Sequence, residues 1–307
     1  MDKTADTHRH SIDLLRFLAA FGIVWAHLLN PHPLAAIGYG ALALFLILVP
    51  YFSVRFFEAR AGEAGPGRGR RRGYSLRRMQ RLILPWLFWS AVFKALLVLQ
   101  SGDPGSLFAL EDPLSLLVGP VIHLWFLPFI FLGTGLVLLA QWMIRDPGGV
   151  ILGSALAFLL SLASLWAHER AELPAPFAQW SFALPAFLFG LLAAFGQKYR
   201  VLWAPVAGFV AVALVWKLAG AQYWPWQYLL ALAVFALAWR FELRSPLFPA
   251  LGALAYGIYL VHPFFMAVWY HFVEPGRLPF LAVAVVFTLS ALTTAVMRRL
   301  PYLRAVV

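Results

Sequence analysis

The sequence contains no cysteine. This absence excludes disulfides, cysteine-ligated metal sites and a thioester intermediate on the protein, and it leaves the redox compartment open. Charged residues are also scarce, at 12% of the chain, which is about half their usual share in soluble domains. Because 62% of the residues are hydrophobic, the composition indicates a polytopic membrane protein, and we treat residues 1–307 as a single transmembrane domain.

The apolar residues are grouped in runs long enough to suggest membrane helices. The first ten residues, MDKTADTHRH, lack the pattern of a cleavable signal, so Ile12–Asn30 is expected to remain as a span. The segment at 226–240 is short for a span, which needs about 20 residues. We therefore predict an all-α polytopic membrane protein with about ten transmembrane helices, at 11–30, 33–57, 83–101, 123–143, 149–167, 180–197, 203–219, 226–240, 247–272 and 279–298.

Acidic residues are few, and the basic ones are unevenly placed. The net charge is +11, and nineteen of the 24 lysines and arginines fall in segments expected on the same side of the membrane as the N-terminus. This positive-inside bias predicts that both termini are cytoplasmic, and it makes 58–82 a basic cytoplasmic loop. Because membrane topology accounts for the positive charge, we expect membrane lipid as a partner and no nucleic acid.

The first apolar segment, IDLLRFLAAFGIVWAHLLN, carries three titratable residues, Asp13, Arg16 and His27. Arg16 and His27 are eleven residues apart, so on a helix they project from nearly one face, separated by roughly 16 Å along the axis. A cation at membrane depth costs about 2.5–3.5 kcal/mol, and such residues usually face a bundle interior. The alternative is that each side chain snorkels to its nearer membrane surface. Because Arg16 and His27 share one face of the helix, we favour a functional site inside the bundle over separate snorkelling of the two side chains.

The basic loop has two parts. Ala61–Gly73 is rich in glycine and arginine and is predicted to be flexible. In Tyr74–Pro85, YSLRRMQRLILP, the residues Arg77, Arg78 and Arg81 recur at helical spacing before the third span begins at Pro85. Such a basic helix either binds anionic lipid or pairs with a phosphate-rich cytosolic ligand.

Three further features lie in or beside spans. His123–Leu127, HLWFL, opens the fourth span, where a histidine and Trp125 also suit an interfacial aromatic belt. In AYGIYLVHP the side chains of Tyr256, Tyr259 and His262 recur every three residues before Pro263, which removes a backbone hydrogen bond and is expected to loosen the helix. This stripe indicates either an interior lining or hydrogen bonding between helices without chemistry. Lys94 lies midway along the third span and has no assigned role.

These motifs together resemble the membrane-bound acyltransferase family 3. The resemblance rests on the R-x10-H pattern of Arg16 and His27, the Arg77–Arg78–x–x–Arg81 run, His123–Leu127, and Tyr256–His262 followed by Pro263, all in family order and across nearly the whole chain. One departure is that Arg299 stands where the family often has a glutamate two residues before a proline. A role of that glutamate is not transferred.

The resemblance implies about ten helices in a bacterial plasma (inner) membrane and transfer of an acyl group, usually acetyl, from cytosolic acyl-CoA to an envelope glycan or lipid-linked saccharide. It makes His27 the catalytic residue with Arg16 beside it, and Arg77, Arg78 and Arg81 the contacts of the acyl donor. The donor is acetyl-CoA or another acyl-CoA, and no metal is expected. Substrate-binding residues would be His123, Trp125, Tyr256, Tyr259 and His262.

Elementary chemistry agrees with this assignment. Acyl transfer to a hydroxyl needs a base with a pKa near neutrality, and histidine is the usual choice. His27 could act on the acceptor directly or through a transient acyl-imidazole. Asp13 is too far along the helix to orient it, at about 21 Å. Tyr259, His262 and His123 are the candidate orienting groups, and the expected arrangement is a pore between a cationic cytosolic mouth and an outer acceptor cleft.

Two other functions remain compatible with these features. A transporter or flippase of a lipid-linked sugar or anion would also use polar stripes and interrupted helices, although we find no inverted-repeat symmetry. A membrane scaffold gives no reason for a cation and a histidine within the first span.

Overall fold

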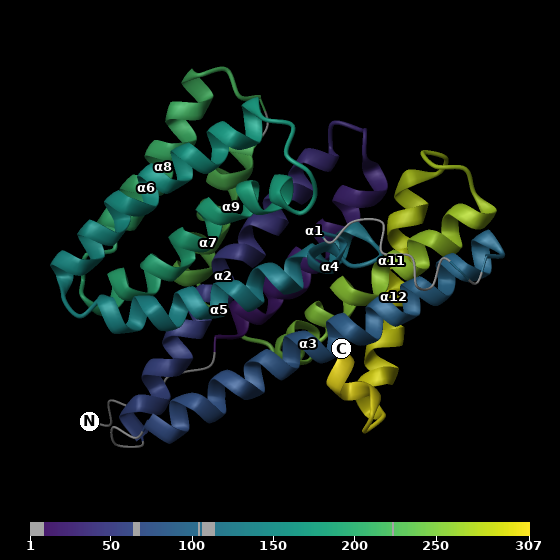
Figure 1. Ribbon diagram of the computed structural model, residues 1–307, viewed down its shortest axis with the longest axis horizontal. Coiled ribbons are helices and arrows are strands. Elements are labelled where there is room, and N and C mark those ends of the chain that lie inside the picture. The colour runs from purple at the N-terminus through teal and green to yellow at the C-terminus, as the bar shows by residue number, and fades with distance from the viewer. Residues whose placement is uncertain (1–8, 64–67, 104, 106–113, 223) are drawn as a thin grey trace. The chain divides into compact units, whose positions relative to one another are not determined.

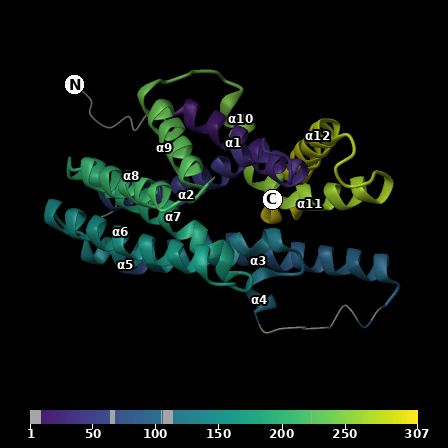
Figure 2. The ribbon, with the colours of Figure 1, turned by 90° about the horizontal axis from the view of Figure 1, so that it is seen from above.

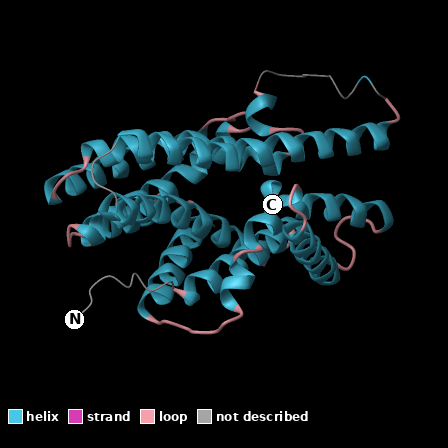
Figure 3. Ribbon diagram, turned by 90° about the horizontal axis from the view of Figure 1, so that it is seen from below, coloured by secondary structure: helices cyan, strands magenta, loops and turns pink. Residues whose placement is uncertain are grey.

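The protein is helical throughout the part of the chain that is placed. The computed structural model describes residues 9–63, 68–103, 105, 114–222 and 224–307, and within these ranges it contains helices, turns and loops but no strand (Figure 3). The prediction of an all-α polytopic membrane protein is thereby confirmed.

Each of the ten predicted apolar segments forms a long helix, and the ninth is split into a short and a long one (Figure 1). The helices described are α1 His10–Leu29, α2 Ala35–Glu63, α3 Arg68–Ser101, α4 Ser115–Val118, η2 Ile122–Trp125, α5 Phe126–Met143, α6 Pro147–Arg170, α7 Phe177–Lys198, α8 Trp203–Leu218, α9 Trp224–Arg240, α10 Phe248–Gly252, α11 Ala255–Phe272, α12 Pro279–Arg299 and η3 Leu303–Val306.

Seven stretches of the described chain are long and apolar enough to cross a bilayer. They are His10–Leu29, Ala35–Phe57, Met79–Ser101, Ile122–Met143, Pro147–Arg170, Phe177–Lys198 and Pro279–Arg299. The remaining predicted segments form α8 with 16 residues, α9 with 17 and α11 with 18, where the last is rich in aromatic and histidine residues. The chain is therefore a multi-pass membrane protein.

The basic loop is more helical than its composition predicts. α2 continues to Glu63 and α3 begins at Arg68, so the flexibility predicted for Ala61–Gly73 is wrong for 61–63 and 68–73; residues 64–67 lie outside the described part. Pro85 does not begin the third span but lies inside α3. The adjoining spans extend as helices because arginine and alanine, frequent in this loop, are good helix formers.

The chain divides into two compact units, each described by itself. The first unit comprises residues 1–45, 226–300 and 307, and the second comprises residues 46–225 and 301–306.

In the first unit, α1 packs against α10, α11 and α12, and α11 packs along α12 (Figure 2). The core between them is built from small and branched residues such as Ala20, Val24 and Val283. Phe287 of α12 meets the rings of Phe17 and Phe21 edge to face, with centroids 5.3 and 5.1 Å apart. Edge-to-face pairs of this kind add stabilisation beyond the area that they bury.

The N-terminal end of α1 is held by a carboxylate from another segment of the same unit. Glu242, just after α9, accepts hydrogen bonds from the His10 backbone N–H at 2.9 Å and from the Ser11 hydroxyl at 3.1 Å, and it pairs with Arg9 Nε at 2.8 Å. A negative charge at a helix N-terminus satisfies unpaired N–H groups and interacts favourably with the helix dipole. The first helix is thus anchored at its N-terminal end.

The second unit is a layer of helices in which α6 packs on α7 and α8, and α5 packs on α3 and α7. Asp146 caps α6 by accepting a hydrogen bond from the Gly149 N–H at 2.7 Å, directly before Pro147 in the first turn. The C-terminal segment joins this unit through Val306, whose carbonyl accepts a hydrogen bond from Trp89 Nε1 at 2.9 Å.

Candidate functional site

Two glycines let α1 and the first part of α2 cross in backbone contact. A Cβ atom at Gly38 would lie 2.3 Å from the Gly22 carbonyl oxygen and 2.8 Å from Ala26, a separation that real side chains do not reach. Small residues at helix crossings permit this kind of close approach in membrane proteins. The crossing brings the Tyr39 ring to 6.4 Å from the His27 ring, at an interplanar angle of 77°.

His27 also meets a second histidine, from α11. The rings of His27 and His262 are stacked with centroids 5.6 Å apart and an interplanar angle of 18°. His262 is fully buried, with 0% of its surface exposed, whereas His27 is half-buried. The structure therefore joins the histidine of the first predicted motif to the histidine of the last.

The ring of His262 is held by the backbone of its own helix. Its Nδ1 lies 2.7 Å from the Tyr259 carbonyl oxygen and 3.3 Å from that of Ile258. Pro263 has no N–H, so the Tyr259 carbonyl lacks its usual helical donor four residues on, and the His262 Nδ1–H replaces it. α11 runs without interruption through Pro263, and the bond from the His262 ring stands in for the backbone hydrogen bond that the proline removes. The arrangement places the proton on Nδ1 and the lone pair on Nε2.

Tyr259 and Tyr256 continue the same stripe. Tyr259 is buried, and its ring centroid lies 6.1 Å from that of His262; Tyr256, one turn earlier, is half-buried. Between them, Gly257 packs directly on Thr294 of α12, because a Cβ there would lie 2.2 Å from the threonine methyl group. Close packing on α12 holds α11 at this level, and the stripe ends at the buried His262.

Arg16 is paired with Asp13 one turn earlier on α1. Its NH1 lies 3.7 Å from Asp13 Oδ1, and 39% of the Arg16 side chain is exposed against 9% of the Asp13 side chain. Gly252, the last residue of α10, packs against Asp13: a Cβ at this glycine would lie 2.6 Å from the Asp13 Cβ. Asp13 is thus engaged near the N-terminal end of α1, about 21 Å along the helix from His27.

The other predicted site residues belong to the second unit. His123 and Trp125 form part of the short helix η2, where His123 is half-buried and Trp125 is buried against Phe126 and Phe129. Arg81 is exposed on α3. Arg77 and Arg78 lie in α3 as their spacing predicted, but their side chains are outside the described part of the structure.

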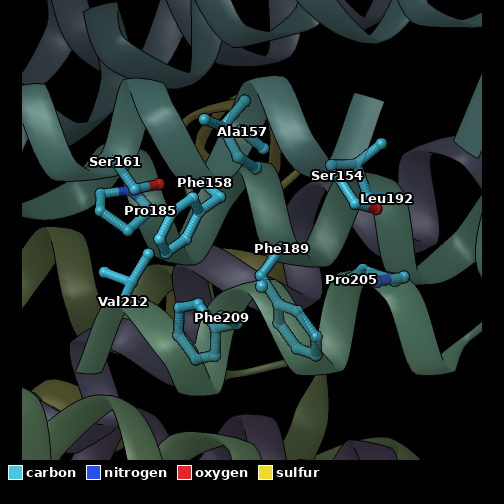
Figure 4. Close-up of a pocket in the computed structure, with 12 residues that line it drawn as sticks. Ser154, Ala157, Phe158, Ser161, Pro185, Phe189, Leu192, Pro205, Phe209 and Val212 are labelled. Carbon is cyan, nitrogen blue, oxygen red and sulfur yellow. The ribbon is translucent and has the colours of Figure 1, made fainter. Parts of the chain in front are cut away.

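The second unit also contains an apolar pocket between α6, α7 and α8 (Figure 4). Its empty volume is about 240 Å³, including space open to the surroundings, and Phe189 and Phe209 stack along it with centroids 4.6 Å apart. The Ser154 hydroxyl on its wall donates back to the Val150 carbonyl at 2.8 Å. The remaining lining is Ala157, Phe158, Ser161, Pro185, Leu188, Leu192, Pro205, Gly208 and Val212. Such a lining suits hydrocarbon and offers no general acid or base.

The site with chemical capacity is therefore the stacked pair His27 and His262, bordered by Tyr39 and Tyr259. An imidazole next to a second imidazole of fixed tautomer can accept and return a proton, which acyl transfer to a hydroxyl requires. Tyr39 was not among the predicted residues. Its signal in the sequence is the Gly38–Tyr39–Gly40 triplet, since glycines beside an aromatic residue in an apolar segment mark a close helix crossing.

Comparison with known proteins gives one match. A family model described as "Acyltransferase domain" matches residues 9–298, which is nearly the whole chain. No curated protein and no solved structure matches the sequence.

Proposed function

The chain belongs to the membrane-bound acyltransferase family 3 and is a membrane acyltransferase, and from this premise we propose that it is an O-acetyltransferase. The proposed donor is cytosolic acetyl-CoA, the proposed acceptor is a hydroxyl group of an envelope carbohydrate or lipid-linked saccharide, and the proposed location is the bacterial inner membrane. The observation that carries the proposal is the stack of His27 on a second histidine, His262, whose ring is fixed by its own helix.

In the proposed reaction His27 is the general base. The acceptor oxygen attacks the thioester carbonyl carbon while His27 takes the hydroxyl proton; the new C–O bond forms, the C–S bond breaks, and the proton passes to the departing CoA thiolate. A two-step route, in which the acetyl group rests on the imidazole, uses the same residue as nucleophile. Both routes need His27 neutral at the start.

The neighbours of His27 have supporting roles. The bond from His262 Nδ1 to the Tyr259 carbonyl fixes the His262 ring, which in turn supports one face of the His27 ring. Tyr39 supports the edge of that ring. A reacting group held by rigid neighbours in this way loses less entropy at the transition state. We therefore assign His262, Tyr259 and Tyr39 to positioning.

Donor and acceptor contacts follow from the motifs. We propose that Arg77, Arg78 and Arg81 of α3 bind the phosphates of the donor, since clustered arginine pairs well with phosphate. His123, Trp125 and Tyr256 are proposed to bind the carbohydrate acceptor, for which aromatic and histidine side chains supply stacking and hydrogen bonds.

The central test replaces His27 by alanine in the full-length protein. His27→Ala is expected to abolish acetyl transfer, measured as acetyl mass on envelope glycans by mass spectrometry, while membrane insertion and thermal stability persist. His271→Ala, at the exposed end of α11, is the control and is expected to leave transfer unchanged. Undiminished acetylation in the His27→Ala strain would refute the role.

A purified-protein assay separates this function from transport. The acyltransferase proposal predicts release of CoA from acetyl-CoA that depends on both acceptor and His27. Movement of a lipid-linked saccharide across vesicles without acyl transfer would instead support a flippase.

A further inference from the structure

Arg298, in the last turn of α12, lies next to the pair formed by Arg16 and Asp13. α12 packs against α1, and both Arg298 and Asp13 contact the Gly252–Ala253 segment. The NH1 of Arg298 donates a hydrogen bond of 2.8 Å to the carbonyl of Ala253. The residue before Ala253 is Gly252, which packs against Asp13. Three segments of the first unit, namely α1, α12 and the end of α10, therefore meet near these two guanidinium groups.

The charge of this cluster is unbalanced. Among the residues that the structure describes, Asp13 is the one carboxylate within ion-pairing distance of Arg16, and none lies at that distance from Arg298. Two guanidinium groups brought together repel each other, and the repulsion is relieved when an anion lies between them. The 39% exposure of Arg16 leaves its remaining donors accessible to such an anion.

We propose that Arg16 and Arg298 form a seat, that is, a binding site, for the diphosphate of the acyl-CoA donor, with Arg298 as an additional binding residue. This inference rests on the proposed function, because it takes the ligand to be the acyl donor. Planar guanidinium groups bind phosphate oxygens in pairs, and each still has N–H donors beyond the bonds described above. The Asp13 carboxylate carries a single negative charge, so it orients Arg16 but does not neutralise both Arg16 and Arg298.

The spacing along α1 suits this ligand. Arg16 and His27 are separated by roughly 16 Å along the helix axis. In coenzyme A the diphosphate and the thioester stand at opposite ends of the pantetheine arm, a linear chain of comparable length. A donor seated by its diphosphate at Arg16 and Arg298 therefore presents its thioester at the level of His27, whereas the 3′-phosphate would extend beyond the seat.

The test is a binding measurement on the full-length protein in nanodiscs. Binding of labelled acetyl-CoA is competed with CoA, dephospho-CoA, 4′-phosphopantetheine and pantetheine. Arg298→Gln is expected to weaken binding of CoA and of dephospho-CoA by about tenfold to about a hundredfold, as for the loss of one charge-assisted hydrogen bond. The affinity of Arg298→Gln for pantetheine, which has no phosphate, is expected to stay within about twofold of that of the unaltered protein. Arg298→Lys keeps the charge and is expected to lose less affinity for CoA than Arg298→Gln.

Arg299→Gln is the matched control, since Arg299 is the neighbouring residue on α12 and is exposed. It is expected to bind every competitor as the unaltered protein does. Equal weakening of CoA and pantetheine by Arg298→Gln would mean that Arg298 only supports the fold, and would overturn the inference. If Arg298→Gln weakens binding of CoA but not of dephospho-CoA, the residue contacts the 3′-phosphate and not the diphosphate, and the inference is overturned as well.

An anionic lipid headgroup offers similar chemistry and is distinguished by the nanodisc composition. If the effect of Arg298→Gln appears only in nanodiscs containing anionic lipid and disappears in zwitterionic ones, the occupant is a headgroup and the inference fails. Arg298-dependent binding of acetyl-CoA without acyl transfer would support the seat and refute the proposed function. Unchanged binding in Arg298→Gln, with transfer intact, would refute only the seat.

Discussion

The bond between His262 and the Tyr259 carbonyl makes a prediction about stability that can be tested without a substrate. His262→Leu removes the donor and puts an apolar side chain of similar size in its place. The Tyr259 carbonyl, which Pro263 cannot satisfy, is then left without a donor. Leaving such a group unsatisfied costs about 1–3 kcal/mol. Side-chain hydrogen bonds in membrane proteins average about 0.6 kcal/mol, so we expect a cost near the lower end, about 1 kcal/mol.

A double-mutant cycle isolates this bond from the packing of the ring. In Pro263→Ala the residue regains its backbone N–H, which can bond the Tyr259 carbonyl as in an ordinary helix. The histidine donor then becomes redundant, so His262→Leu is expected to cost less in the Pro263→Ala background than in the original one. The expected coupling is about 1 kcal/mol, measured by reversible unfolding in mixed micelles.

The control is His271→Leu, which removes an exposed histidine from the far end of the same helix and is expected to show no coupling with Pro263→Ala. Coupling between His262→Leu and Pro263→Ala below about 0.3–0.5 kcal/mol, the range of simple additivity, would refute the reasoning. In that case the Tyr259 carbonyl would not depend on the histidine, and the fixed tautomer of His262 would lose its physical basis.

Two further predictions concern the ends of helices. Asp146→Ala removes the N-cap of α6 and is expected to destabilise the protein by about 0.5–2 kcal/mol in the same unfolding assay, whereas Asp146→Asn keeps an acceptor and should cost less; equal costs would argue against the cap. Burial raises the pKa of Glu242, but hydrogen bonds from the His10 N–H and the Ser11 hydroxyl, together with the charge of Arg9, lower it overall below its ordinary value of 4.5. Because the carboxylate form is the one stabilised by folding, this contribution is present above pH 4.5 and is lost as the pH falls through the lowered pKa. The unfolding midpoint should therefore fall more steeply with acidification in the original protein than in Glu242→Gln, and parallel pH profiles would contradict this.

Periodicity and composition carry much of the fold because they depend on residues close in the chain. Runs of apolar residues located all ten long helical segments, and the three-residue spacing of Tyr256, Tyr259 and His262 placed them on one stripe. Predictions from local sequence were less successful where a helix-breaking residue and a helix-supporting feature occur together. The arginine- and glycine-rich loop was predicted to be flexible, yet its described ends are helical, and Pro263 was predicted to loosen a helix that a neighbouring side chain repairs.

The sequence by itself determined the membrane class, the expected orientation of the chain, the family, and the polar residues Arg16 and His27 of the first helix. Only the tertiary structure decided that His27 stacks on His262, that Tyr39 borders this pair, and that Arg298 and Asp13 meet at the end of α10. The physical reason is that helix spacing fixes which residues share a face, whereas the partner of that face depends on how closely two separate helices approach, as they do at Gly22 and Gly38.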